Sequence, residues 1–211
     1  KRFRNKNVSA DTIVIKEINS LLNKLTDKNV VIISEKIASK LKGKDYLKQM
    51  MIDNILHKCV IQSNYNCYYI TILIDIYKDT PSINDLIETN TDQIYHKIKN
   101  EVIDSDQSEY MQFCDKNKKL DLLIGHSLLI TELEKLNIIS NRIIPSLNEL
   151  IEIISATQDL DEKYKCVQCL YNIFKSYYGD SLLPQGFLDK LNLIVESEKS
   201  NKIKFKVMDI I

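Results

Sequence analysis

The chain has 211 residues, 44% of them hydrophobic, and its 29 Lys and Arg balance 29 Asp and Glu to a formal net charge of zero. This apolar content excludes an intrinsically disordered chain and allows a packed core. The zero net charge excludes a uniformly basic nucleic-acid-binding protein and leaves only local basic patches for that role. The 32 Ile, 26 Lys and 18 Asn suggest an AT-rich genome.

Two features bear on the location of the protein. The longest apolar runs fall short of the roughly 18–20 residues that span a bilayer, and the opening Lys-Arg-Phe-Arg lacks the apolar stretch of a secretory signal. The five cysteines are odd in number and suggest no small disulfide framework. We therefore expect a cytoplasmic protein with no membrane contact. Because the first residue is not Met, we also expect a segment of a longer protein.

Apolar residues recur at steps of three and four along almost the whole chain, which is the pattern of amphipathic helices. The stripes predict ten helices in chain order, over 15–25, 30–41, 47–55, 69–76, 86–102, 122–136, 144–154, 167–174, 187–194 and 203–210. The segment 68–77 is β-branched and aromatic, so a strand stays open there as the alternative. Its flanks are typical of helices, and we therefore prefer a helix.

Turn residues divide these helices. Thr26-Asp27 resembles a cap between the first two, and Gly43 and Gly179 can take the left-handed conformation that ends a helix. Ser140 precedes another expected start, and Asp159 places negative charge at the N-terminus of the next helix, where the helix dipole favours it.

The helices form pairs whose starts lie roughly 35–50 residues apart, near the period of HEAT and armadillo repeats. A helix pair cannot bury its apolar face alone, so such pairs stack into a solenoid. The predicted fold is all-α, a superhelix of about five HEAT-like antiparallel pairs over 11–211, after a basic arm at 1–10. An irregular helical bundle is the alternative.

Three stretches resemble one known family in the right order. Residues 18–26 contain Leu-Asn-Lys-Leu-Thr, residues 124–136 open on Ile-Gly and end on Glu-Leu-Glu-Lys-Leu, and residues 201–211 contain Lys-Ile-Lys-Phe before Asp. They are similar to the first, a middle and the last helix of the middle domain of translation initiation factor 4G. Leu129 stands where that family has Phe, and the region 81–121 is shorter.

The resemblance implies five HEAT-type helix pairs in a crescent, acting as a monomeric scaffold in translation initiation. It implies binding to the DEAD-box RNA helicase of initiation, factor 4A, and to RNA, with a cap-binding protein held only through flanking sequence. Candidate helicase contacts are Asn23, Lys24, Leu129, Glu132, Lys202 and Lys204. Candidate RNA contacts are Lys1, Arg2, Arg4, Lys6 and Lys206.

Each candidate also has a structural interpretation. Asn23 could bond a neighbouring loop and hold two repeats in register. Glu132 and Lys135 lie one helical turn apart and could pair with each other. Lys206 could lie on a solvated face, and the basic arm could be a solvated tail or a nuclear-localisation-like run.

Nothing in the sequence points to catalysis or a cofactor. Cys166-x-x-Cys169 is a single pair, whereas a structural zinc needs four ligands, so we expect both thiols to pack in the core. Gly125-x-Ser127 lacks the second glycine of a nucleophile elbow. His57, His96 and His126 have no acid at a recognisable spacing. We therefore predict a binding protein and no enzyme.

Two other functions compete with initiation. Relatives of the factor 4G middle domain act in mRNA decay, splicing, nuclear cap binding and recruitment of poly(A)-binding protein. A generic HEAT adaptor would bind protein partners only, without RNA or helicase.

Overall fold

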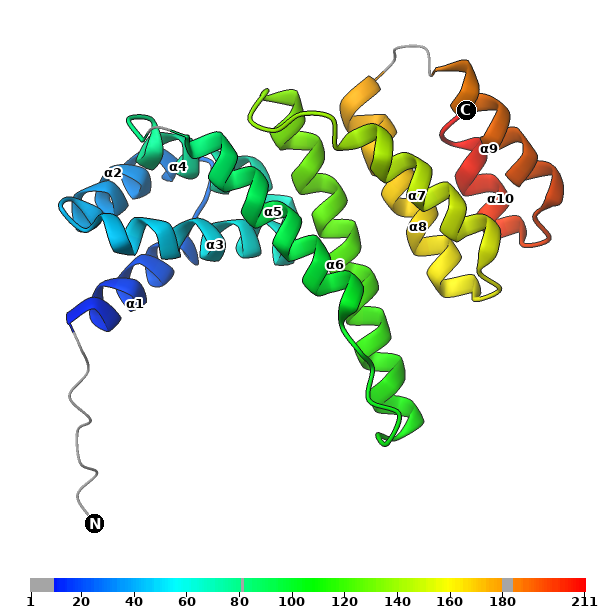
Figure 1. The fold of residues 1–211 in the computed structure, drawn as a ribbon, viewed down its shortest axis with the longest axis horizontal. Helices are drawn as coiled ribbons and strands as arrows, with labels where there is room; N and C mark the ends of the chain where they lie inside the picture. Colours follow the sequence, from blue (N-terminus) through cyan, green and yellow to red (C-terminus); the bar gives the residue numbers. More distant parts are fainter. Residues whose placement is uncertain (1–9, 81, 180–183) are drawn as a thin grey trace.

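The computed structural model describes residues 10–80, 82–179 and 184–211, and every regular element in these ranges is a helix. The α-helices are α1 (Ala10–Leu22), α2 (Val30–Leu41), α3 (Asp45–Ile61), α4 (Asn66–Tyr77), α5 (Ile83–Asn100), α6 (Glu109–Lys135), α7 (Ile143–Ala156), α8 (Leu160–Ile173), α9 (Gln185–Ser197) and α10 (Asn201–Met208) (Figure 1). A 3-10 turn, Ser63–Tyr65, precedes α4, and a π-helical turn, Phe174–Tyr178, follows α8. The all-α prediction is confirmed for these ranges, and α4 replaces the alternative strand.

The helices follow one another as pairs along the molecule. Each even-numbered helix contacts the odd-numbered helix before it, and α2, α4, α6, α8 and α10 contact one another in that order. Figure 1 shows α1–α4 at one end, α7–α10 at the other, and α6 crossing between them. The even-numbered helices therefore join the five pairs from one end of the fold to the other.

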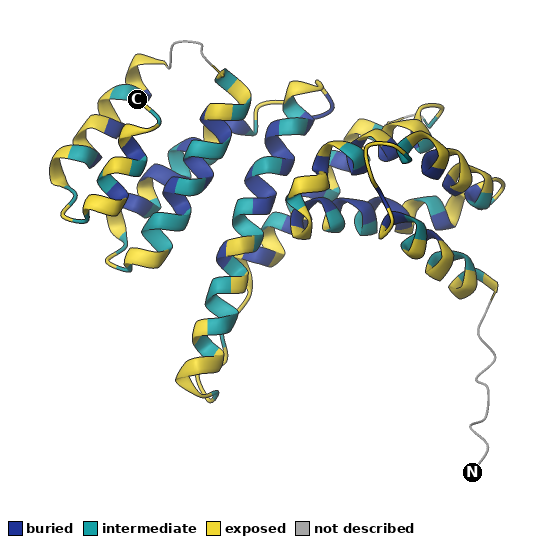
Figure 2. Cartoon of the chain, turned by 180° about the vertical axis from the view of Figure 1, so that it is seen from behind, coloured by how far each residue is buried: buried dark blue, intermediate teal, exposed yellow. Residues whose placement is uncertain are grey.

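One apolar cluster runs from Ile18 in α1 to Val207 in α10. The predicted stripes supply it: Leu22, Leu133 and Leu147, for example, are all fully buried. Figure 2 shows the buried residues where helices face each other and the exposed residues on the outer surfaces. Each large aliphatic side chain removed from water in this way stabilises the fold by about 1.5–3 kcal/mol.

Several predicted helix ends are confirmed. Gly43 after α2 and Gly179 after the π-helical turn have φ of 73° and 58°. Asp159 Oδ1 accepts hydrogen bonds from the backbone N–H groups of Asp161 and Glu162, both at 3.0 Å, and so caps α8.

The predicted cap at Thr26-Asp27 is wrong, because α2 begins only at Val30. Asn29 holds the connection between α1 and α2 instead. Its Nδ2 donates to the carbonyl oxygen of Lys24 at 2.8 Å, and its Oδ1 accepts from the Thr26 backbone N–H at 2.8 Å. A single amide side chain thus closes the loop from both sides.

Helix α6 has 27 residues and starts 13 positions before the predicted stripe. The last turn of α5, the connection after it and the N-terminal half of α6 project from the body as a finger, residues 97–121 (Figure 1). Ser108 caps α6 by accepting from the Met111 N–H at 3.4 Å. The finger was not predicted because residues 109–119 of α6 bury no side chain fully and therefore carry no apolar stripe.

Candidate macromolecule-binding groove

The residues predicted to contact a helicase or RNA lie in different parts of the structure. Asn23 and Lys24 lie just after α1, Glu132 lies near the end of α6, and Lys202, Lys204 and Lys206 lie on α10. The arm residues Lys1, Arg2, Arg4 and Lys6 lie outside the described ranges. The predicted contact residues therefore do not form one site.

Leu129 is buried and does not reach the surface. Its exposed fraction is 0%, because it lies on the face of α6 that packs into the core. The neighbouring Leu128 is half-buried. The prediction that Leu129 contacts a helicase is wrong, since a side chain at this position is inaccessible to a partner.

Asn23 links the first two helix pairs. Its Oδ1 accepts a hydrogen bond of 2.7 Å from Lys58 Nζ of α3, and burial lowers the pKa of Lys58. We had expected Asn23 to bond the backbone of a neighbouring loop. Its partner is instead the side chain of Lys58. Lys24 is exposed beside it, so both residues remain on an accessible surface.

Glu132 is held by its own neighbours. Its Oε1 accepts from Lys135 Nζ at 3.2 Å and from Ser176 Oγ of the π-helical turn at 2.9 Å. The expected one-turn pair with Lys135 is confirmed. Glu132 thus ties the end of α6 to the turn that follows α8.

The lysines of α10 lie against tyrosines of α8. Lys202 Nζ is 3.9 Å from the centre of the Tyr164 ring, and Lys206 Nζ is 3.5 Å from the centre of the Tyr171 ring. Such cation–π contacts hold α10 onto α8. Lys202 stays exposed, whereas Lys204 and Lys206 are partly buried.

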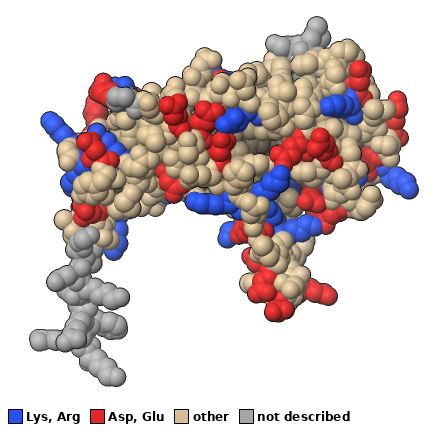
Figure 3. All heavy atoms as spheres, in the orientation of Figure 1, with Lys and Arg blue, Asp and Glu red and all other residues tan. Residues whose placement is uncertain are grey.

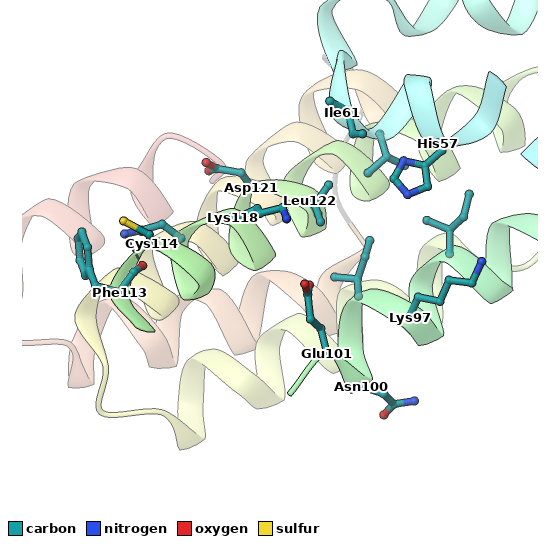
Figure 4. Close-up of a pocket in the computed structure, with 14 residues that line it drawn as sticks. His57, Ile61, Lys97, Asn100, Glu101, Phe113, Cys114, Lys118, Asp121 and Leu122 are labelled. Atoms are coloured by element: carbon teal, nitrogen blue, oxygen red, sulfur yellow. Dashed lines mark hydrogen bonds between the residues drawn. The ribbon is translucent and has the colours of Figure 1, made fainter. Parts of the chain in front are cut away.

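A groove of about 980 Å³ lies between α3, α5 and α6 (Figure 4). The sequence analysis did not predict this groove. Its floor contains the buried side chains of Val60, Ile94 and Ile98. Two large apolar side chains, Ile61 and Phe113, remain 59% and 55% exposed at its edges. The only sequence signal for it was a pair of aromatic residues at helical spacing, Tyr110 and Phe113, in a segment otherwise rich in charge.

The rim of the groove carries unpaired cations. Lys97 of α5 and Lys118 of α6 form no ion pair or hydrogen bond with any residue that the structure describes. The carboxylate of Asp121 is bonded to Lys165 Nζ at 2.5 Å. His57 of α3 is exposed on the same rim (Figure 4).

Hydrogen bonds at the finger hold the walls of the groove in place. Lys119 Nζ donates to the carbonyl oxygens of Lys99 at 2.9 Å and Glu101 at 3.1 Å, which would otherwise lack partners at the end of α5. Gln112 Nε2 donates to the carbonyl oxygens of Ser105 and Gln107 in the connection. The finger is therefore braced at both its helical and its loop segments.

A second, polar cleft of about 600 Å³ lies between α1 and α3. It is lined by Asn23, among others, and shares His57 and Ile61 with the apolar groove. Asn54 Nδ2 donates to Asn19 Oδ1 at 3.1 Å across it. The two hollows adjoin at His57 and Ile61, and together they are called the trough; it extends from the end of α1 past α3 to the finger.

Three cysteines and one histidine are buried, whereas Cys67, His57 and His96 are exposed. Cys166 and Cys169 are free and buried, and burial raises the pKa of Cys166 to about 12 and that of Cys169 further. Their predicted packing in the core is confirmed. Burial lowers the pKa of His126 to about 4, and its ring stacks on Tyr95 with centroids 5.0 Å apart. Residues 10–80, 82–179 and 184–211 contain no group of three metal-binding side chains.

No helix within the described ranges is long and apolar enough to cross a bilayer. Comparison with protein-family models gave no match, and no curated protein is detectably similar to the chain in sequence.

Proposed function

We propose that this chain is a HEAT-type scaffold, similar to the factor 4G middle domain, that binds the DEAD-box RNA helicase of translation initiation and RNA. The observation that carries the proposal is the order of the helix contacts. Five consecutive pairs are joined through α2, α4, α6, α8 and α10, which is how repeats of a helical solenoid share a core.

The placement of the three family-like stretches supports the same proposal. They lie in α1 and the turn after it, in the second half of α6, and in α10. These positions belong to the first, third and fifth pairs. The resemblance therefore follows the repeats and does not fall on scattered segments.

The trough is the surface that we assign to a protein partner. It contains Asn23 beside the exposed Lys24, and it continues into the apolar groove. Lys202 and Lys204 lie on α10, at the other end of the fold. A two-lobed helicase could therefore contact the two ends separately, as the resemblance implies, with the basic residues also available to RNA.

The test is a binding and ATPase experiment with a purified factor 4A-type helicase. We expect a complex in calorimetry and a raised RNA-dependent ATPase rate. The double variant Lys24→Glu/Lys202→Glu should weaken the complex at least fivefold, whereas Lys36→Glu, which lies on the exposed face of α2, should not. Absence of a complex together with an unchanged ATPase rate would refute the helicase assignment.

A protein-only adaptor is the second candidate, and the apolar floor of the groove favours it, since such a floor suits protein side chains and not phosphates. Gel-shift measurements with single-stranded RNA at low salt separate the two. The adaptor predicts no shift, and the initiation scaffold predicts a shift that salt weakens.

A further inference from the structure

We propose that the groove between α3, α5 and α6 binds a short amphipathic helix of a protein partner with acidic side chains at one end. The partner buries large apolar side chains on the groove floor and places its carboxylates against Lys97 and Lys118. This inference rests on the proposed scaffold function, because it names the chemistry of a partner for that surface.

Two large apolar side chains are exposed at the edges of the groove. Ile61 and Phe113 expose more than half of their surface beside a floor of buried aliphatic side chains. Phe113 and Ile61 stand at opposite ends of the groove in Figure 4. A large apolar surface in a concave site is typical of a binding surface.

The dimensions fit a helix of two to three turns. Phe113 and Leu122 bound the wall formed by α6, and a helical segment of that length is about 13 Å long. Apolar residues at positions i, i+3 or i+4, and i+7 of a bound helix span roughly 10 Å. Three such side chains therefore fit along the floor, and a volume of about 980 Å³ accommodates them.

The charges determine the kind of helix. Lys97 and Lys118 stand on two different helices that border the floor, and neither has a carboxylate partner among the residues that the structure describes. Asp121 on the same rim is already bonded to Lys165, and Glu101 is the one other acid of the lining. Acidic side chains of a partner would meet two free cations there.

The tip of the finger sets the direction of the partner. Between positions 101 and 115 the sequence has five acidic residues, Glu101, Asp104, Asp106, Glu109 and Asp115, and no Lys or Arg. Figure 3 shows acidic atoms at the tip and basic atoms where the finger leaves the body. Like charges repel, so the acidic end of the partner should face Lys97 and Lys118 and its neutral or basic end should face the tip.

The experiment uses the full chain and a designed, fluorescein-labelled helical peptide. The peptide has three leucines spaced by three and four positions and three glutamates at one end, and its twin has three lysines in place of the glutamates. Fluorescence anisotropy should show the acidic peptide binding at least tenfold more tightly than the basic one. Raising the salt concentration should reduce this preference.

Charge reversal identifies the site. The variant Lys97→Glu/Lys118→Glu should weaken binding of the acidic peptide at least tenfold and strengthen that of the basic peptide. The matched control, Lys36→Glu/Lys175→Glu, reverses two exposed lysines outside the groove and should leave both affinities unchanged. Circular dichroism and urea titration check that each variant is folded.

A second pair of variants tests the apolar contact. Phe113→Ala should weaken the acidic peptide about tenfold, whereas Val102→Ala should not, because Val102 is 88% exposed on the finger and does not line the groove. Equal binding of both peptides, binding that survives the charge reversal, or competition by single-stranded RNA would overturn the inference. So would a lack of peptide binding by the folded chain.

The peptide experiment and the helicase experiment test different claims. Peptide binding without a helicase complex would leave the groove assigned and reject the helicase. A helicase complex without peptide binding would reject the groove assignment and leave the scaffold function in place.

Discussion

Gly125 of α6 lies so close to Val60 of α3 that a Cβ on Gly125 would stand 1.9 Å from the Val60 carbonyl oxygen. A glycine inside a helix costs about 1 kcal/mol relative to alanine. Here the absent side chain allows α3 and α6 to cross in backbone contact. Because Val60 is part of the groove floor, this contact also fixes the shape of the groove.

The variant Gly125→Ala should therefore destabilise the protein by about 2–3 kcal/mol, although alanine is the better helix former. The obstructing atoms belong to backbone and cannot rotate away. Urea denaturation measures the effect. The control is Gly186→Ala in α9, where nothing lies within 4 Å of the added methyl group, and it should be neutral or stabilising by up to about 1 kcal/mol. Equal stabilities of the two variants would contradict the crossing of α3 and α6.

His126 makes the stability depend on pH. Burial lowers its folded-state pKa to about 4, below the value of roughly 6.5 in an unfolded chain. As the pH falls, the unfolded chain therefore protonates His126 before the folded chain does. The stabilising contribution is complete above pH about 6.5 and is lost as the pH falls toward 4, by up to about 3 kcal/mol.

Urea titrations at pH 7.5 and pH 5 measure this loss. His126→Gln should reduce the difference between the two pH values, because it removes the buried group that titrates. His57→Gln changes an exposed ring and should leave the difference as it is. A difference that persists in His126→Gln would assign the pH dependence to other groups.

A distant carboxylate caps α7. Glu134 Oε2, on α6, accepts from the backbone N–H groups of Arg142 at 2.8 Å and Ile143 at 3.1 Å. Glu134→Ala should cost about 1–2 kcal/mol in thermal or urea unfolding, as the loss of other helix caps does. Glu152→Ala, on the exposed side of α7, should change stability by less than about 0.5 kcal/mol. If both variants unfold alike, the cap contributes nothing.

These helix ends show which parts of the fold the sequence could predict. Asp159 caps α8 through N–H groups two and three positions away, so a local pattern was sufficient. The start of α7 after Ser140 was predicted, but its cap comes from eight or nine positions back, on another helix, and was not predicted. Local spacing contains no information about such partners.

The core could be predicted from the sequence, whereas the groove could not. Apolar stripes predicted the core, because one buried face follows directly from the helical period. The groove needs three helices and the contact between Gly125 and Val60, which no local stripe contains. The three motifs identify segments of the sequence but do not show which of their side chains are exposed. Exposure depends on how the helices pack against one another.

Leu129 offers a direct test of that distinction. In the resembling family a Phe occupies this position, but here the side chain is fully buried. Leu129→Phe should overpack the core and destabilise the chain by about 1–3 kcal/mol, without strengthening any complex with the helicase. Leu128→Phe adds the same volume at a half-buried position and should cost less than about 1 kcal/mol. Chemical denaturation and calorimetry with the helicase measure the two effects. A Leu129→Phe protein that is as stable as the parent and binds the helicase more tightly would place this residue on the partner surface after all.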